Sequence, residues 1–210
     1  MPGSVTLNIK NDGASATIVD DPVKSGNKAL CLVSVPGESA GDGVEFLTTG
    51  VGASCYVFES RIYIDSETDD GLILQIKLDG AYMLTFTKSG ETVTVKDSAT
   101  TTNQSLKTNV IGNVSTDTWF KIRAEYYVNG EENGISTPQI KLFLDDEYVK
   151  TTDNFFGSHT AGKAPNNSYS KVNVLSPRAK SGKIYFDDCF FSKESKTYNA
   201  DDNQISDSRG

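Results

Sequence analysis

Polar side chains recur at every second position of three strand-like runs, FESRIYI (58–64), LILQIKLD (72–79) and WFKIRAEYYV (119–128). Because successive side chains of a strand point to opposite faces, each run predicts one polar and one apolar face. If the three strands neighbour one another in a sheet, their polar faces form one hydrogen-bonding surface. Planar polar groups of this kind suit sugar hydroxyls. The residues of this predicted ligand-binding surface are Glu59, Arg61, Gln75, Lys77, Arg123, Glu125 and Tyr127.

The same alternation has a plainer interpretation. Any half-buried antiparallel sheet shows it, and the polar face is then a solvated surface with incidental cross-strand ion pairs. Both interpretations stay open at the level of the sequence.

The sequence holds no complete pattern of the paired carboxylates that glycoside hydrolysis requires. Retaining hydrolysis needs two carboxylates about 5–5.5 Å apart. The series Glu59, Asp65 and Glu67 runs off its strand into a loop, and a cross-strand pair of Glu59 with Glu125 is conceivable. The single histidine, His159, lies in a loop of Gly, Ser and Thr, where a surface role is commoner than a catalytic one. We therefore predict no catalytic residue.

Calcium is the only cofactor that the sequence leaves open. Asp187 and Asp188 near the end of the chain could meet Asp20 and Asp21 near its start, and calcium requires many oxygen ligands. The alternative is that Asp187 accepts hydrogen bonds from a neighbouring loop. No Gly-rich phosphate loop, HExxH or nucleophile elbow is present.

The three cysteines, Cys31, Cys55 and Cys189, contain no CxxC pair that would indicate zinc or redox chemistry. Each lies inside a strand-like run, which favours small buried apolar side chains. A strand-to-strand disulfide between Cys31 and Cys189 is left open.

Charge excludes some partners. The chain of 210 residues holds 20 lysines and arginines against 28 aspartates and glutamates, a net charge of −8. This balance argues against nucleic acid and anionic membranes, which need clustered cations. There is no run of about 18 apolar residues, so we expect no membrane insertion. The start lacks the pattern of a signal peptide, and the composition, rich in Thr, Ser, Asn, Asp and Gly, favours a module excised from a larger protein.

Short runs rich in Val, Ile, Thr, Tyr and Phe, separated by turn residues, predict an all-β fold. Tight turns are expected at 79–80, 89–90, 129–130 and 145–146. No amphipathic helix spacing occurs, so we predict a two-sheet antiparallel β-sandwich. Its strands are expected at 27–35, 44–49, 54–65, 72–79, 81–87, 92–97, 118–129, 139–145, 148–152, 171–175 and 183–192.

Two segments fall outside these strands. Residues 153–170 form a long loop whose aromatic residues Phe155, Phe156 and Tyr169 could stack on a ligand or cover the core. Residues 193–210 carry almost no apolar side chain, so we predict a single domain over 1–192 and a polar tail or linker over 193–210.

The order of segments resembles concanavalin A-like jelly-roll domains of the laminin-G type. The resemblance rests on IVDDPVKSGNKALCLVS, YVFESRIYID, TWFKIRAEYY followed by KLFLDDEYV, and KIYFDDCFF, and covers about residues 15–192. It implies two curved antiparallel sheets. Many members are carbohydrate-binding or adhesive domains of secreted proteins, and others are glycoside hydrolases or polysaccharide lyases, so fold alone does not decide function.

The lyase pattern within this family is only partly matched. Arg61 and the run Gln75-Ile76-Lys77 are similar to its Arg strand and its Gln-x-His strand, but Lys77 stands where histidine is wanted. The Tyr-x-Lys-x-Gly-x-Tyr segment is missing. The resemblance therefore implies a non-catalytic carbohydrate-binding or adhesive module, extracellular or at the cell surface, with a polysaccharide or glycan partner. The alternatives are a divergent polysaccharide lyase and a structural protein-interaction domain.

Overall fold

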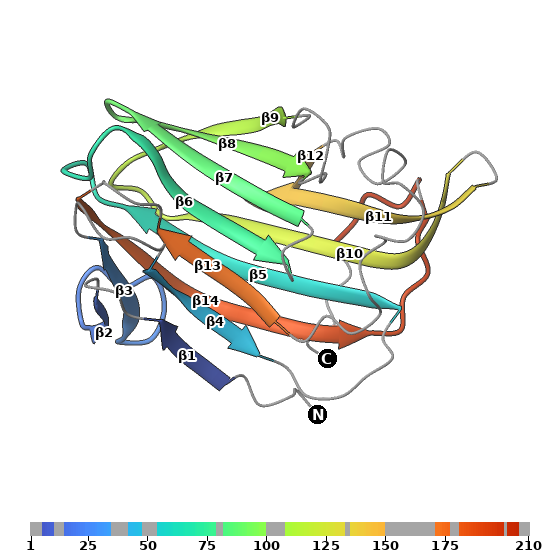
Figure 1. Cartoon of the computed structure of the whole chain (residues 1–210), viewed down its shortest axis with the longest axis horizontal. Helices are drawn as coiled ribbons and strands as arrows, with labels where there is room; N and C mark the ends of the chain where they lie inside the picture. The colour runs from blue at the N-terminus through green and yellow to red at the C-terminus, as the bar shows by residue number, and fades with distance from the viewer. Residues whose placement is uncertain are drawn as a thin grey trace.

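The computed structural model describes residues 6–10, 15–34, 42–47, 54–78, 82–99, 108–132, 135–149, 171–176, 181–199 and 201–205. The strands in these ranges form two antiparallel 7-stranded sheets that lie face to face (Figure 1). Sheet A has the order β1 (Thr6–Lys10), β4 (Asp42–Leu47), β13 (Lys171–Ser176), β6 (Gly71–Leu78), β7 (Tyr82–Ser89), β8 (Thr92–Ala99) and β9 (Thr108–Ser115). Sheet B has the order β12 (Glu147–Val149), β11 (Ile135–Leu144), β10 (Phe120–Glu132), β5 (Cys55–Ile64), β14 (Gly182–Glu194), β3 (Ala29–Ser34) and β2 (Ser15–Val19). The predicted all-β, two-sheet sandwich is confirmed.

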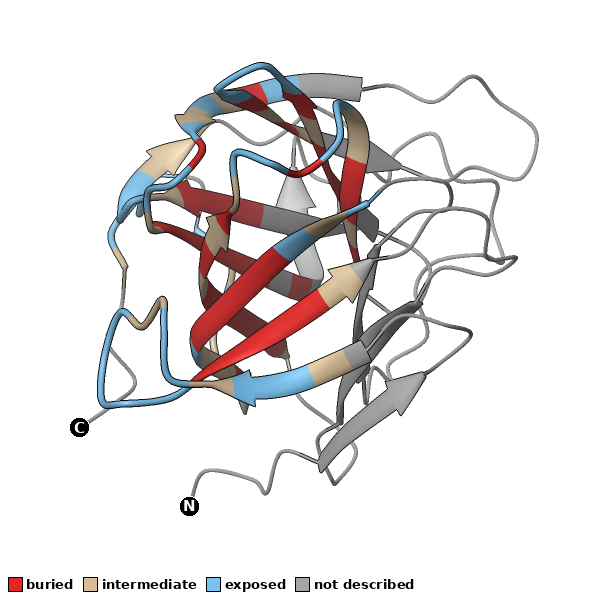
Figure 2. Cartoon of the chain, turned by 90° about the vertical axis from the view of Figure 1, so that its left-hand side faces the viewer, coloured by how far each residue is buried: buried red, intermediate tan, exposed pale blue. Residues whose placement is uncertain are grey.

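The hydrophobic core lies between the two sheets. Phe58, Ile62 and Ile64 of β5 are at most 1% exposed, and Leu84 and Phe86 of β7 belong to the same cluster from the opposite sheet. Figure 2 shows buried stretches along the strands and exposed residues gathered at the turns. Each such side chain stabilises the fold by about 1.5–3 kcal/mol when fully buried. These core residues identify the inner face of sheet B. The residues that alternate with them along each strand point to the outer face.

Strand β6 lies in sheet A, whereas β5 and β10 are neighbours in sheet B. The expectation that all three strands share one sheet is therefore wrong. After β5 the chain crosses to the other sheet through residues 65–70 instead of turning back as a hairpin. Alternation in a strand reports which residues face inward, but not which sheet the strand joins.

Two of the predicted turns are confirmed. Ser89 and Gly90 lie at the β7–β8 connection, where Gly90 has a φ of 58°. Asp145 and Asp146 connect β11 to β12 with φ values of 51° and 68°, as a hairpin turn with two left-handed residues requires. The turn predicted at 79–80 lies outside the described residues.

The predicted turn at Asn129-Gly130 is wrong. The pairing of β10 with β11 shifts register between Tyr127 and Gly130 and continues as far as Glu132 opposite Ile135. The glycine therefore sits at a β-bulge, which is the other common use of glycine inside a strand.

Every predicted run overlaps an observed strand, and the sequence does not predict β1, β2 and β9. These strands, TLNIK, SATIV and TNVIGNVS, are short or rich in polar residues, so they carry little periodic signal. The long loop 153–170, with Phe155, Phe156, His159 and Tyr169, lies outside the described residues. In the described part of the chain no helix has the length and apolar character that a membrane span requires.

All three cysteines are free. Cys31 lies beside Tyr185 on the outer side of sheet B, whereas Cys189 packs against the core on the inner side. The two sulfurs are therefore separated by the sheet itself, and the disulfide left open by the sequence does not form.

Candidate functional site

The outer face of sheet B collects most of the predicted surface. Antiparallel pairing places Arg123 opposite Glu59 and Lys121 opposite Arg61. Their neighbours in each strand belong to the core, so these side chains point away from it. Glu125 and Tyr127 follow on the same face of β10. Gln75 and Lys77 do not join them, because β6 lies in sheet A, and the Lys77 side chain lies outside what the structure describes.

A buried ion-pair network occupies the middle of this face. Arg123 Nη1 lies 3.0 Å from Glu59 Oε2, and its Nη2 lies 2.7 Å from Glu125 Oε1. Lys121 Nζ lies 3.2 Å from Glu59 Oε1. Arg123 is 2% exposed, Glu59 2% and Glu125 1%. These residues face outward as predicted, yet they are sealed from solvent, so a ligand does not reach them in this state of the molecule.

The hydroxyl of Tyr127 donates to Glu125 Oε2 at 2.6 Å. Burial, and then this contact with Glu125, raises the pKa of Tyr127. The pKa of Arg123 is also raised, because its bonds to Glu125 and Glu59 outweigh the opposing effect of burial. Glu59 and Glu125 both contact Arg123, so the conceivable cross-strand carboxylate pair is neutralised by a guanidinium.

The segment after β14 covers part of this network. Lys196 Nζ lies 3.6 Å from Glu125 Oε1 and 2.7 Å from Glu194 Oε2, and Ser54 Oγ donates to the Lys196 carbonyl at 2.9 Å. The Tyr198 ring lies 5.4 Å from the ring of Tyr127, centroid to centroid. Strand β14 continues to Glu194, so the boundary predicted at residue 192 falls inside a strand. The first part of the predicted tail is folded onto the domain through ion pairs and a ring contact, which hydrophobicity does not reveal.

A cavity of about 540 Å³ opens next to the network, between the β11–β12 turn and the C-terminal segment. Lys121 is held there by Asp146, whose Oδ1 lies 2.7 Å from Lys121 Nζ. The backbone N–H of Lys121 donates to Asp145 Oδ1 at 2.8 Å, which fixes the turn against β10. The lining residues are Lys121, Asp146, Glu147, Tyr148, Asn203, Gln204 and Ile205.

An aromatic row crosses the same face beyond Lys121. Tyr63 lies 5.5 Å from Trp119 and 5.6 Å from Tyr185, ring centroid to ring centroid. Tyr63 and Trp119 are partly exposed, and Tyr63 donates to Asp117 Oδ1 at 3.2 Å. Burial, and then the Asp117 carboxylate, raises the pKa of Tyr63. Beside the row, Arg61 Nε lies 3.1 Å from an oxygen of Asp188.

The sequence predicts Arg61 as a site residue but not the aromatic row. Two features of the sequence could have indicated this row: Tyr63 shares a face of its strand with Arg61, and Trp119 immediately precedes β10. The pairing of Phe120 with Ile62 then brings Trp119 beside Tyr63. That register follows from the folded sheet, not from either strand alone.

Asp187 holds a loop in place. Its Oδ2 accepts the backbone N–H groups of Lys24 and Ser25, each at 2.9 Å. Burial acts to raise the pKa of Asp187, but these backbone donors outweigh it and the pKa is lowered. This is the alternative to a metal ligand that the sequence leaves open.

Two other residues of the predicted calcium site, Asp188 and Asp20, are also engaged with cations. Asp188 pairs with Arg61, and Asp20 pairs with Lys28. Among the described residues no three His, Cys, Asp or Glu side chains cluster in a way that could hold a metal. Oxygens that already accept N–H groups and face cations do not fit a calcium site at Asp187 and Asp188.

We predict that Asp187→Asn lowers the free energy of unfolding by about 1–2 kcal/mol at pH 7, because one oxygen that accepts two backbone N–H groups is lost. A carboxyl with a lowered pKa stabilises the fold fully above its unfolded value of about 3.9, and this stabilisation is lost as the pH falls through the folded value. The difference between wild type and variant in urea midpoint should therefore narrow below about pH 4. A difference of equal size at pH 7 and pH 3 would contradict this role.

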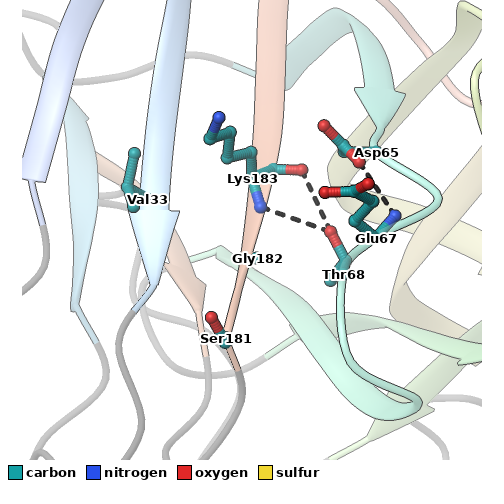
Figure 3. A pocket seen from close by; sticks show the side chains of 7 residues that line it. All are labelled: Val33, Asp65, Glu67, Thr68, Ser181, Gly182 and Lys183. Carbon is teal, nitrogen blue, oxygen red and sulfur yellow. Dashed lines mark hydrogen bonds between the residues drawn. The ribbon is translucent and has the colours of Figure 1, made fainter.

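A second cavity, of about 150 Å³, lies where residues 65–70 meet the start of β14 (Figure 3). Thr68 Oγ1 donates to the Lys183 carbonyl at 3.3 Å and accepts the Lys183 N–H at 3.2 Å. Ser181 N donates to Asp69 Oδ2 at 2.8 Å. These contacts fasten the crossing between the two sheets, so we assign this end of the molecule a structural role.

Two face-to-face antiparallel sheets in this strand order define a concanavalin A-like jelly roll. The sequence matches no known family model and no curated protein. The structure is similar to an endo-β-1,4-glucuronan lyase from the fungus Trichoderma reesei (9% identity, TM-score 0.56, 89% of this chain and 90% of that chain). It is also similar to a carbohydrate esterase from the Shiga toxin-encoding bacteriophage phi24B (14% identity, TM-score 0.59, 90% of each chain). A third similar structure is that of botulinum neurotoxin type C, whose cell entry depends on two ganglioside molecules (11% identity, TM-score 0.52, 91% of this chain and 44% of that chain). At these identities the likeness shows the shared fold.

Proposed function

We propose that this protein is a non-catalytic carbohydrate-binding or adhesive module of a secreted or cell-surface protein, with its glycan site on the outer face of sheet B. The observation that carries the proposal is the partly exposed aromatic row of Trp119 and Tyr63 beside the Arg61–Asp188 pair. A sugar ring presents apolar C–H groups on its face and hydroxyls at its edge. Aromatic faces and planar polar groups next to one another complement both.

The site differs from the surface that the sequence predicts. Arg61 remains part of it, and Trp119, Tyr63 and the cavity at Lys121 are added. Arg123, Glu125 and Tyr127 lie beneath the surface, where they support β10. A ligand therefore contacts the open part of the face, between the aromatic row and the cavity.

The chemistry of the network supports binding over catalysis. A general base must be able to accept a proton from the substrate within hydrogen-bond reach. Glu59 and Glu125 are buried against Arg123, and the Tyr127 hydroxyl already donates a hydrogen bond to Glu125. The similar carbohydrate-active and ganglioside-dependent proteins make a glycan ligand reasonable for this fold, and the site argues for it independently.

We expect Trp119→Ala to weaken glycan binding at least about tenfold, because it removes half of the stacking surface. A glycan array, followed by titration with the best hit, measures the change. Val110→Ala is the control, since Val110 is 59% exposed on β9 of the other sheet and its truncation removes exposed apolar surface away from the site. Unchanged binding in a folded Trp119→Ala variant would rule out this site. Arg123→Ala is unsuitable, because loss of binding there would reflect loss of structure.

A polysaccharide lyase is the second candidate, favoured by the similarity to a glucuronan lyase. Lyases leave an unsaturated sugar that absorbs in the ultraviolet. We expect a flat absorbance trace when the protein is incubated with glucuronan and alginate. A steady rise that Trp119→Ala abolishes would replace the binding proposal with the lyase.

A further inference from the structure

The two cations that flank the open part of the face, Arg61 beside the aromatic row and Lys121 in the cavity, are already matched by carboxylates. Arg61 pairs with Asp188 at 3.1 Å, and Lys121 pairs with Asp146 at 2.7 Å and with Glu59 at 3.2 Å. Beneath them, Arg123 lies between two glutamates. The face therefore offers many hydrogen-bonding groups but little net positive charge.

An acidic sugar would have to compete with these carboxylates. A uronate or sulfate gains most from a cation when no other anion holds it, because charge-assisted bonds are the strong ones. An acidic group that approaches Arg61 or Lys121 would meet Asp188 or Asp146 next to that cation. The net charge of −8 also repels a polyanion at long range.

An uncharged sugar meets no such competition. A paired guanidinium or carboxylate still has N–H groups or lone pairs directed to other partners, and these bind hydroxyls. The cavity at Lys121 adds the side chains of Tyr148, Asn203 and Gln204 to this set. From this charge balance we infer that the ligand of the face is a neutral glycan, free of uronate and sulfate groups. The inference rests on the proposed function and names its ligand class.

The first test compares neutral and acidic oligosaccharides of equal length. Cello-, manno- and xylo-oligosaccharides are titrated against alginate and glucuronan oligosaccharides by calorimetry. We expect at least one neutral series to bind, with the acidic series at least about tenfold weaker. Tighter binding of an acidic series that is lost in Trp119→Ala would overturn the inference and leave the proposed function standing. No binding by either series would overturn the proposed function itself.

The second test releases a cation. Asp188→Asn removes the carboxylate that faces Arg61, and asparagine tolerates the φ of 48° at this position. We expect the ratio of affinity for acidic to affinity for neutral oligosaccharides to rise several-fold, because an incoming acidic group no longer competes with Asp188 for Arg61. Asp70→Asn is the matched control, because it removes a carboxylate 3.1 Å from Lys88, which belongs to sheet A. Equal behaviour of the two variants would show that carboxylate pairing does not set the ligand class.

Discussion

Arg123→Ala should lower the free energy of unfolding by about 3–5 kcal/mol, because it leaves two buried carboxylates without their shared cation. Glu59 and Glu125 are 2% and 1% exposed, so both carboxylates lie away from bulk solvent. Tyr127 would also lose the fixed orientation of its acceptor, Glu125. Urea denaturation followed by fluorescence measures the loss as a shift in midpoint at constant slope.

Arg61→Ala is the matched control for this prediction. Arg61 lies on the neighbouring strand β5, on the same outer face, and also pairs with a carboxylate, but its side chain is 29% exposed and that of Asp188 is 39% exposed. Solvent screens such a pair, so its loss should cost about 1 kcal/mol or less. Equal midpoints for the two variants would mean that the Arg123 network is solvated in solution, and the sealed interior of this face would then be wrong.

The sequence predicts the facing of individual strands well. The alternation in FESRIYI and WFKIRAEYYV places Phe58 and Ile62 inward and Glu59, Arg61 and Arg123 outward, as found. The reason is local, since the pleat of a strand assigns a face to each residue without reference to the rest of the chain. The same logic predicts the two-sheet sandwich.

The arrangement of strands into sheets could not be predicted in this way. Gln75 follows the same alternation as Arg61, but its strand is reached through a crossing to the other sheet. That crossing is held by Thr68 against Lys183, a contact between residues 115 positions apart. The burial of Glu125 could not be predicted from the sequence either. The residues packed over this part of the network, Lys196 and Tyr198, belong to a polar stretch without periodicity. The proposed glycan site therefore lies farther along the face than the sequence predicts, at Trp119 and not at Arg123.

Close packing at the crossing between the two sheets predicts a large loss of stability when Gly182 is replaced. Gly182→Ala should lower the free energy of unfolding by about 2–3 kcal/mol, at the upper end of what added methyl groups cost in packed sites. A Cβ at position 182 would lie 2.4 Å from Thr68 Cγ2 and 2.7 Å from Thr68 Cβ. Thr68 is 4% exposed, and its hydroxyl is hydrogen-bonded to the backbone of Lys183. Its side chain therefore cannot rotate away from the new methyl group without breaking the hydrogen bonds drawn in Figure 3.

A double-mutant cycle separates this clash from other effects of alanine. Thr68→Gly removes the atoms that the new methyl group meets and should itself be destabilising, because the bonds to Lys183 are lost. If the clash is the cause, adding Gly182→Ala to Thr68→Gly costs little or nothing further, and the coupling energy offsets most of the single-variant loss. Additive losses, or a wild-type urea midpoint for Gly182→Ala, would contradict the close packing of residues 65–70 on β14. The crossing that places β6 in the opposite sheet from β5 would then need another source of stability.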